Sequence, residues 1–363
     1  MEISLAGADL EGATFEGAGL RGADFADANL KRSRFDGADL TNALLENAQL
    51  SDATLRYSVL TGAALEGANL NRADLWGTTL QSANVTGADF GEAHIEEANF
   101  DQADCTGSSF RGATIRSSSF RNAVLRRVDL EGSLCRSLDL RGADLSGARL
   151  QGLDLSDSQL GGVHLADAWL DRTAIRPEQI AEALGEELAR DYSGAGRAYF
   201  ALERNFASLG DAHSASRQRR RKRRMLKRAA RESAVLAFGE GRWASAVAFS
   251  GRWAMDEAAE LICDYGESVP RVLRSIVATY LLFFGLFTLI GEVGRQVGNR
   301  IEPASLGDVA IYSLIALTTQ SNTPSGDIVL GGSLTSLLAA IEGLLGIGLT
   351  GLLGFVVGVK LHR

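Results

Sequence analysis

The first half of the chain repeats its hydrophobic positions every five residues. Each position divisible by five from Leu5 to Ile175 is Leu, Phe, Ile, Val or Cys, and the position two residues earlier is usually small, as at Ala8 and Ala28. A period of five fits neither a strand, whose side chains alternate, nor a helix with its 3.6-residue turn. It predicts a solenoid in which one residue of each short side points into the interior.

The repeated unit reads A-(D/N)-L-x-x, as in Ala8-Asp9-Leu10. It resembles the unit of the pentapeptide-repeat family, and the resemblance implies a right-handed, four-sided β-solenoid with four units per coil. Residues 1–175 contain 35 units. With coils about 4.8 Å apart, the rod would be about 42 Å long. Bulky residues at the small position predict a wider or bent coil in the last third. These residues are Val128, Leu138, Leu153 and Val163.

Composition gives no sign of an enzyme. The chain has 363 residues, 45% of them hydrophobic, and a net charge of −8 that averages segments of opposite sign. Cys105 and Cys135 occupy central positions of the repeat and are expected in its core, while Cys263 lies far from both. Without neighbouring histidines these cysteines form no zinc or redox motif. We therefore expect no catalytic residue, no metal site and no cofactor.

Residues 176–268 form a connector of predicted helices. Pro177 suits the first turn of a helix that runs to Leu188 and caps the solenoid. A second helix is expected after the Ser-Gly-Ala-Gly stretch at 193–196, and it ends at Gly210.

A basic run follows within the connector, because residues 217–231 include ten Lys and Arg and no acid. The run can be a solvated helical face, a nucleic-acid site, or a surface for anionic lipid headgroups at about 1 kcal/mol per residue. Nucleic-acid sites usually interleave aromatic side chains, which are absent here, so we expect lipid but no nucleic acid as a partner. Two copies of Gly-Arg-Trp-Ala, at 241–244 and 251–254, suit either a membrane interface or a soluble helical hairpin.

The remaining residues, 269–363, have the pattern of a membrane domain. Two apolar segments, at about 271–293 and about 333–361, are long enough to span a bilayer. Between them a helix is predicted at about 306–317, and its length of about 18 Å is too short for a hydrocarbon core of about 30 Å. This arrangement predicts a re-entrant loop, which is tolerated only where it lines water or is buried in protein.

Charge predicts the orientation of the two spans. Arg271 and Arg274 begin the first span, and Lys360 and Arg363 follow the second, so both ends should face the cytosol. The first twenty residues are acidic and not continuously apolar, which argues against a signal peptide. We expect a multi-pass protein of the plasma (inner) membrane of a prokaryote, with both termini in the cytosol.

The segment after the short helix is rich in hydroxyl and amide groups. Their oxygens can replace part of a cation's hydration shell, and the C-terminal end of a helix carries partial negative charge. We expect a selectivity filter within about 318–326. Its candidate residues are Thr318, Thr319, Gln320, Ser321 and Asn322.

The stretch Ile-Tyr-Ser-Leu-Ile-Ala-Leu-Thr-Thr at 311–319, with Gly326-Asp327 after it, resembles the two-transmembrane pore-loop channels related to potassium channels. The resemblance implies a homotetrameric ion pore. In that family a Gly-aromatic-Gly filter follows the second threonine at once, whereas six other residues separate Thr319 from Gly326 here. Potassium selectivity does not carry over, so both Na⁺ and K⁺ are candidate permeant ions.

The second span contains further candidates. Glu342 lies about 12 Å from the outer end of this span, where an acid facing lipid would be costly, so we expect it to face an aqueous pore cavity. Six glycines between 343 and 358 favour close packing or bending. Gly346 or Gly348 is the candidate gating hinge.

Together the patterns predict a mixed architecture of three domains: a solenoid at 1–175, a helical connector at 176–268 and an α-helical pore domain at 269–363. The expected function is a homotetrameric, passive, cation-conducting channel. Its cytosolic solenoid would serve regulation or scaffolding and can bind a protein partner. The alternative is a non-conducting, membrane-anchored scaffold that docks a partner on its solenoid.

Overall fold

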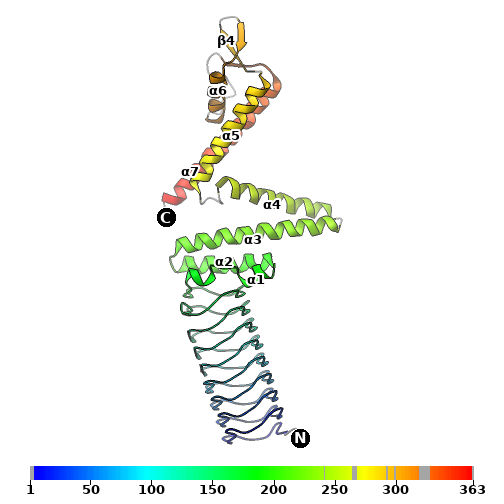
Figure 1. The fold of residues 1–363 in the computed structure, drawn as a ribbon, viewed down its shortest axis with the longest axis vertical. Coiled ribbons are helices and arrows are strands. Elements are labelled where there is room, and N and C mark those ends of the chain that lie inside the picture. The colour runs from blue at the N-terminus through cyan, green and yellow to red at the C-terminus, as the bar shows by residue number, and fades with distance from the viewer. Residues whose placement is uncertain are drawn as a thin grey trace. The chain divides into compact units, whose positions relative to one another are not determined.

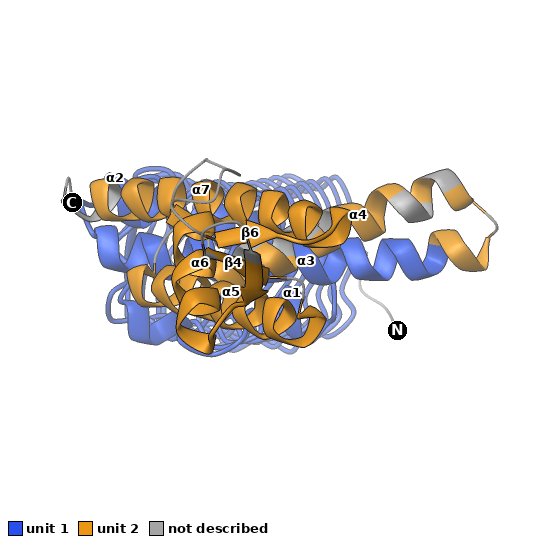
Figure 2. Cartoon of the chain, turned by 90° about the horizontal axis from the view of Figure 1, so that it is seen from above, with its two compact units in different colours: residues 1–236 blue, residues 237–363 orange. Residues whose placement is uncertain are grey.

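The computed structural model describes residues 4–240, 242–263, 268–291, 293–297, 300–318 and 328–361. The chain divides into two compact units, Met1–Leu236 and Ala237–Arg363, which Figure 2 shows in different colours. The first unit contains the five-residue repeats and the helices that follow them. The second contains the two long apolar segments and the short helix between them.

Residues 4–175 wind into stacked coils (Figure 1). Backbone bridges join residues 20 positions apart, always in parallel, as at Asp9–Asn29 and Asn29–Gln49. Because 20 residues are four units of five, this register confirms the predicted four-sided solenoid. On one face the pairing widens into three short parallel strands, β1 (His94–Glu96), β2 (Thr114–Arg116) and β3 (Leu134–Arg136).

A tight turn follows most of the central residues. The amide of Ala8 donates to the carbonyl of Leu5 at 3.1 Å, and Gly7 between them has a φ of 65°. Glycine adopts this left-handed conformation freely, and Asn and Asp tolerate it better than most residues. Glycine therefore recurs at this position, and Asp27 and Asn42 occupy it elsewhere with φ angles of 59° and 56°. The turn allows the chain to change direction every five residues.

The interior of the coils is a ladder of apolar side chains. Phe15 stacks on Phe35 one coil later with ring centroids 4.8 Å apart, and small residues such as Ala28 are fully buried beside the ladder. Cys105 and Cys135 are buried in this core, as predicted. Burial raises the pKa of both thiols, that of Cys135 to about 11, so neither is a ready nucleophile at neutral pH.

The coil backbone is irregular on one face in the last third of the solenoid. In this part of the described chain the bridge ladder skips the pair Leu134–Asp154. Near this pair, the amide of Ser137 donates to Asp157 Oδ1 at 3.0 Å, so a side chain replaces a backbone acceptor. The bulky residues at the small position are all buried: Val128, Leu138, Leu153 and Val163.

Beyond the last coil, residues 177–188 form two short turns instead of the single predicted helix. They are the 3₁₀ turn η1 (Pro177–Ile180) and α1 (Gly185–Leu188). A Cβ atom at Gly185 would lie 2.2 Å from the ring of His164 and 2.6 Å from the carbonyl oxygen of Gly162. The backbone therefore rests directly on the last coil here, and this contact takes precedence over the helical periodicity.

Polar side chains replace the coil that would come next, and we call Gln179, Glu186 and Asn205 the coil-end cap. Glu186 Oε1 accepts hydrogen bonds from the amides of Leu165 and Ala166, each at 2.6 Å. Asn205 Oδ1 accepts from the amide of Thr173 at 3.0 Å, and Asn205 Nδ2 donates to the carbonyl of the same residue at 2.9 Å. Gln179 Nε2 donates to the carbonyl of Leu155 at 2.7 Å. Because buried backbone groups are costly to leave unpaired, these bonds stabilise the end of the solenoid.

Two longer helices complete the first unit, α2 (Tyr192–Ser208) and α3 (Ala212–Gly239), the end of which passes into the second unit. The side chain of Asp191 caps α2 by accepting from the amide of Gly194 at 2.8 Å. The sequence had placed the Ser-Gly-Ala-Gly stretch before this helix, but the structure places it inside α2. A Cβ atom at Gly196 would lie 2.9 Å from the side chain of Leu226, so small residues here allow α2 and α3 to approach closely.

Part of the basic run holds α3 against residues 180–182 and against α2. Arg221 donates to the carbonyl of Ile180 at 2.8 Å, and Arg219 and Lys222 bind Glu203 at 2.7 Å and 2.6 Å. Burial pushes the pKa of Glu203 upward, but the bonds from Lys222 and Arg219 outweigh it, and the net shift is downward. The run thus contributes to tertiary packing, a role that its charge pattern did not predict.

In the second unit, the helix α5 (Val269–Ile290) ends before residue 293, where the sequence had placed the end of the first apolar segment. Gly291 caps it with a φ of 67°, after which the chain enters strand β4 (Val293–Val297). β4 is the central strand of an antiparallel sheet of order β5-β4-β6, with β5 at Arg300–Pro303 and β6 at Ile328–Leu330. The sequence pattern did not predict this sheet. The helices of the unit are α4 (Trp243–Cys263), α5 (Val269–Ile290), α6 (Leu306–Thr318) and α7 (Ser333–Leu361).

The coil-end cap leads to a testable difference between two substitutions. Glu186→Ala leaves the amides of Leu165 and Ala166 without their acceptor, at a cost of about 1–3 kcal/mol for each orphaned group. Glu186→Gln keeps an acceptor oxygen in place and removes a buried carboxylate whose pKa is raised by burial. We expect faster hydrogen exchange at these two amides in the Ala variant and near-native exchange in the Gln variant. Equal protection in both would contradict the capping role.

Candidate functional site

The helices α5, α6 and α7 pack against one another in the second unit. α5 and the Ser333–Gly358 part of α7 are long and apolar enough to cross a membrane. α6 has 13 residues, so at about 20 Å it is too short to do so. The contacts between α6 and α5 include an edge-to-face pair of the Phe287 and Tyr312 rings at 5.4 Å and a hydrogen bond from the Tyr280 hydroxyl to the Ala310 carbonyl at 3.4 Å.

The first turn of α6 is closed by a reciprocal cap. The carboxylate of Asp308 accepts from the amide and the hydroxyl of Ser305 at 3.0 Å and 2.7 Å, and Ser305 Oγ accepts from the amide of Asp308 at 3.2 Å. An acid in this turn also suits the positive end of the helix dipole. Arg295 of β4 lies 3.6 Å from Asp308, so the start of α6 is tied to the sheet.

The other end of α6 contacts the backbone of α7. A Cβ atom at Gly346 would lie 1.9 Å from the carbonyl oxygen of Leu317, and one at Gly343 would lie 3.2 Å from that of Ala316. A side chain at Gly346 is therefore incompatible with α6 in this position. At Gly348, the other hinge candidate, an added Cβ would meet no atom of the described residues within 4 Å. Gly346 is a contact residue in this structure, and a hinge role for either glycine stays a prediction.

Glu342 lies on the α7 face that packs against α6. Its side chain is fully buried, and Ser313 Oγ donates a hydrogen bond to its Oε1. Its Oε2 has no hydrogen-bond partner within the described residues. In the single chain this carboxyl group thus faces α6 and not an open cavity. Its predicted part in an aqueous pore cavity stays a prediction.

The filter candidates begin where α6 ends. Thr318 is the last residue of α6, and its hydroxyl donates to the carbonyl of Leu314 at 2.8 Å. The chain is described again from Ile328, where β6 begins. The remaining candidates lie outside the described residues: Thr319, Gln320, Ser321 and Asn322.

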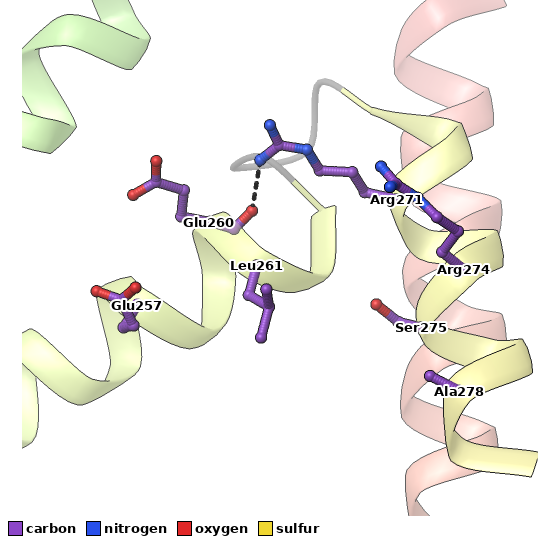
Figure 3. A pocket seen from close by; sticks show the side chains of 7 residues that line it. All are labelled: Glu257, Glu260, Leu261, Arg271, Arg274, Ser275 and Ala278. Carbon is purple, nitrogen blue, oxygen red and sulfur yellow. Dashed lines mark hydrogen bonds between the residues drawn. The ribbon is translucent and has the colours of Figure 1, made fainter. Parts of the chain in front are cut away.

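A cavity of about 570 Å³ lies between α4 and the start of α5 (Figure 3). Glu257 and Glu260 of α4 line it opposite Arg271 and Arg274 of α5. Arg271 also donates to the carbonyl of Glu260 at 2.9 Å, the dashed line in Figure 3. Because acids and bases line the cavity in equal number, it favours neither an anion nor a cation. The hydrogen bond from Arg271 to Glu260 links α4 to the start of the first apolar helix beside this cavity.

The repeats of the first unit match a known family. A family model described as pentapeptide repeats matches eight copies, over residues 3–42, 33–72, 58–96, 93–132 and 139–173. The coil register of 20 residues agrees with this match. These coils form a pentapeptide-repeat domain. The family match comes from the sequence of the repeats, and the 20-residue register comes from their backbone pairing.

Several solved structures are similar to this chain. HetL, a pentapeptide repeat protein involved in heterocyst differentiation regulation from the cyanobacterium Nostoc sp. strain PCC 7120, is 26% identical, with a TM-score of 0.34 over 48% of this chain and 86% of that chain. A pentapeptide repeat protein from the Arabidopsis thaliana thylakoid lumen is 26% identical, with a TM-score of 0.21 over 30% and 66%. QnrB1, a plasmid-mediated fluoroquinolone resistance protein, is 18% identical, with a TM-score of 0.25 over 52% and 98%. The search of curated proteins finds no match.

Sequence reasoning alone misses Ser313 as a site residue. A serine within an apolar helix, followed later by a lone acid in an apolar span, is a usable signal for a buried polar pair. Nothing in the sequence, however, pairs Ser313 with Glu342, which lies 29 residues later. The pairing depends on how α6 lies across α7, which the intervening sheet helps to set.

The two hinge candidates differ in a way that substitution can test. Gly346→Ala places a methyl group where the Leu317 carbonyl lies, so we expect a lower thermal midpoint for the purified protein in detergent. Gly348→Ala is the matched control, because its added methyl group would touch no described atom. Alanine also favours a helix over glycine by up to about 1 kcal/mol. The midpoint of this control should equal or exceed that of the wild type. A Gly346→Ala variant as stable as the Gly348→Ala variant would refute the close contact.

Proposed function

We propose that the protein is a homotetrameric, passive ion channel that conducts cations, with its pentapeptide-repeat domain serving regulation or scaffolding. The observation that carries the proposal is α6, a helix too short to cross a bilayer that packs against two helices long enough to do so. A re-entrant segment of this kind is tolerated in a membrane only beside water or protein. The proposal assigns the ion path to residues 318–326, in the plasma (inner) membrane and with both termini in the cytosol.

Exposed apolar side chains on the long helices support burial of the second unit in a membrane. Leu289 of α5 is 85% exposed and Leu344 of α7 is 71% exposed in the single chain. Transfer of apolar surface out of water is favourable by about 25 cal/mol per Å². Extended apolar surface of this kind marks a membrane or a protein interface.

The open side of α6 supports assembly of several copies. Ile311 and Leu314 are 55% and 52% exposed, although α5 and α7 cover the other side of the helix. In the proposal, neighbouring copies cover these residues, and four copies close a ring around the pore. An isolated pair of spans would leave this part of α6 uncovered.

The preference for cations rests on helix polarity and on the oxygen donors that follow. The C-terminal end of α6 carries partial negative charge, which favours a cation at the point where the filter candidates begin. Hydroxyl and carbonyl oxygens are suitable substitutes for the water around Na⁺ or K⁺. No other ligand, cofactor or catalytic step is part of the proposal.

A surface cluster on the solenoid supports a protein partner. Tyr57 and Trp76 are exposed, with ring centroids 5.9 Å apart, and the guanidinium of Arg56 lies 6.0 Å from the centroid of the Trp76 ring. Trp, Tyr and Arg are the residue types that most often dominate binding energy at interfaces. The same cluster supports the alternative function, a non-conducting membrane scaffold that docks a partner here.

Recording from planar bilayers that contain the purified protein tests the proposal. We expect single-channel currents whose reversal potential under a KCl gradient lies nearer the equilibrium potential of K⁺ than that of Cl⁻, because the C-terminal helix ends favour positive ions. The size of the complex in detergent should correspond to four chains. A monomer or dimer with no current would favour the scaffold, and an anion-selective reversal potential would reject the cation channel.

A further inference from the structure

Part of the α7 face toward α6 lies in close contact with the α6 backbone. Ala339, Glu342, Gly343 and Gly346 share this face, because Glu342 and Gly343 each lie three or four residues from both Ala339 and Gly346. The ideal Cβ positions at Gly343 and Gly346 lie 3.2 Å and 1.9 Å from carbonyl oxygens of α6, whereas at Gly351, Gly354 and Gly358 the described part of the chain places no atom within 4 Å. The close approach therefore involves only the part of α7 that meets the last turn of α6.

The hydrogen bond between Ser313 and Glu342 lies beside this contact. Ser313 precedes Ala316 and Leu317 by about one helical turn, so the bond and the glycine contact act on consecutive turns of α6. Both side chains are fully buried. A carboxyl group in such surroundings is costly unless it is hydrogen-bonded, so the bond strongly favours one position of α6 along α7.

We infer that Glu342 is a positioning residue: its bond to Ser313, together with Gly346, sets the place at which α6 ends and the filter candidates begin. This inference rests on the proposed function for its effect on conduction, since it concerns the same ion path. It assigns Glu342 a different task from that of attracting cations in a pore cavity. A positioning role depends on the hydrogen bond to Ser313, whereas an electrostatic role depends on the charge.

Four variants of the full-length protein separate the two roles: Ser313→Ala, Glu342→Leu, their combination, and Glu342→Gln. Gln retains an oxygen that accepts from Ser313 but carries no charge, and Leu has a similar size without an acceptor. Ser336→Ala is the control, because that serine is exposed on α7 and its hydroxyl donates to the Gly332 carbonyl just before this helix at 3.0 Å. Each protein is measured for its thermal midpoint in detergent and for its Na⁺/K⁺ permeability ratio in bilayers.

Positioning predicts that Ser313→Ala and Glu342→Leu each lower the midpoint by about 3 °C or more and each change the permeability ratio. The double variant should be no worse than the worse single variant, because both substitutions break the same bond. Glu342→Gln and Ser336→Ala should stay near the wild type in both measurements.

Two results overturn the inference. The first is a double variant in which the two decreases in thermal midpoint add up. The second is a Ser313→Ala variant that behaves like the wild type while Glu342→Gln loses conductance. If Ser313→Ala yields no folded protein, the comparison of Glu342→Gln with Glu342→Leu tests the inference by itself. Equal midpoints and equal permeability ratios in these two variants would contradict the positioning role. If the wild type carries no current, the channel proposal fails, while the thermal midpoints still test the Ser313–Glu342 contact.

Discussion

Pairing of backbone N–H and C=O groups is the constraint on which both units of this structure depend. In the solenoid each coil satisfies the groups of the one before it, so the stack can continue but cannot simply stop. The coil-end cap meets this need with side chains: the carboxylate of Glu186 and the amide groups of Gln179 and Asn205 take the places of the next coil's backbone. In the second unit the α-helices satisfy their own backbone groups internally, the solution that a bilayer demands.

Small residues serve the same purpose in both units, which is to bring backbone close to other atoms. In the solenoid, alanines beside the central ladder, such as Ala28, are fully buried and leave room for the coils to stack closely. Between helices, Gly196 allows α2 to approach α3, and Gly346 allows α7 to approach the end of α6. Side chains at these glycines would push the elements apart, and the polar contacts near them depend on that closeness.

Two buried acids, Glu186 and Glu342, illustrate how a charged residue type becomes structural. Each uses one carboxyl oxygen for hydrogen bonds, to two amides in one case and to a serine hydroxyl in the other. The second oxygen of each has no partner within the described residues. Such an arrangement strongly favours one geometry, since any shift of the packed element would leave further buried polar groups unpaired.

The amino-acid sequence alone determined the solenoid and its buried cysteines, because a five-residue period is a local property that recurs at every coil. Four units per coil was what the resemblance to the pentapeptide-repeat family implied, and the 20-residue backbone register confirms it. It also determined the long apolar helices, because their lengths and composition appear directly in the residue pattern. Only the tertiary structure decided that residues 177–188 form two turns, that Arg221 binds the Ile180 carbonyl, and that Ser313 meets Glu342. A local pattern shows which face of an element is apolar, but it does not show what lies opposite that face. These contacts join residues 29 and 41 positions apart, and their partners are set by the path of the intervening chain.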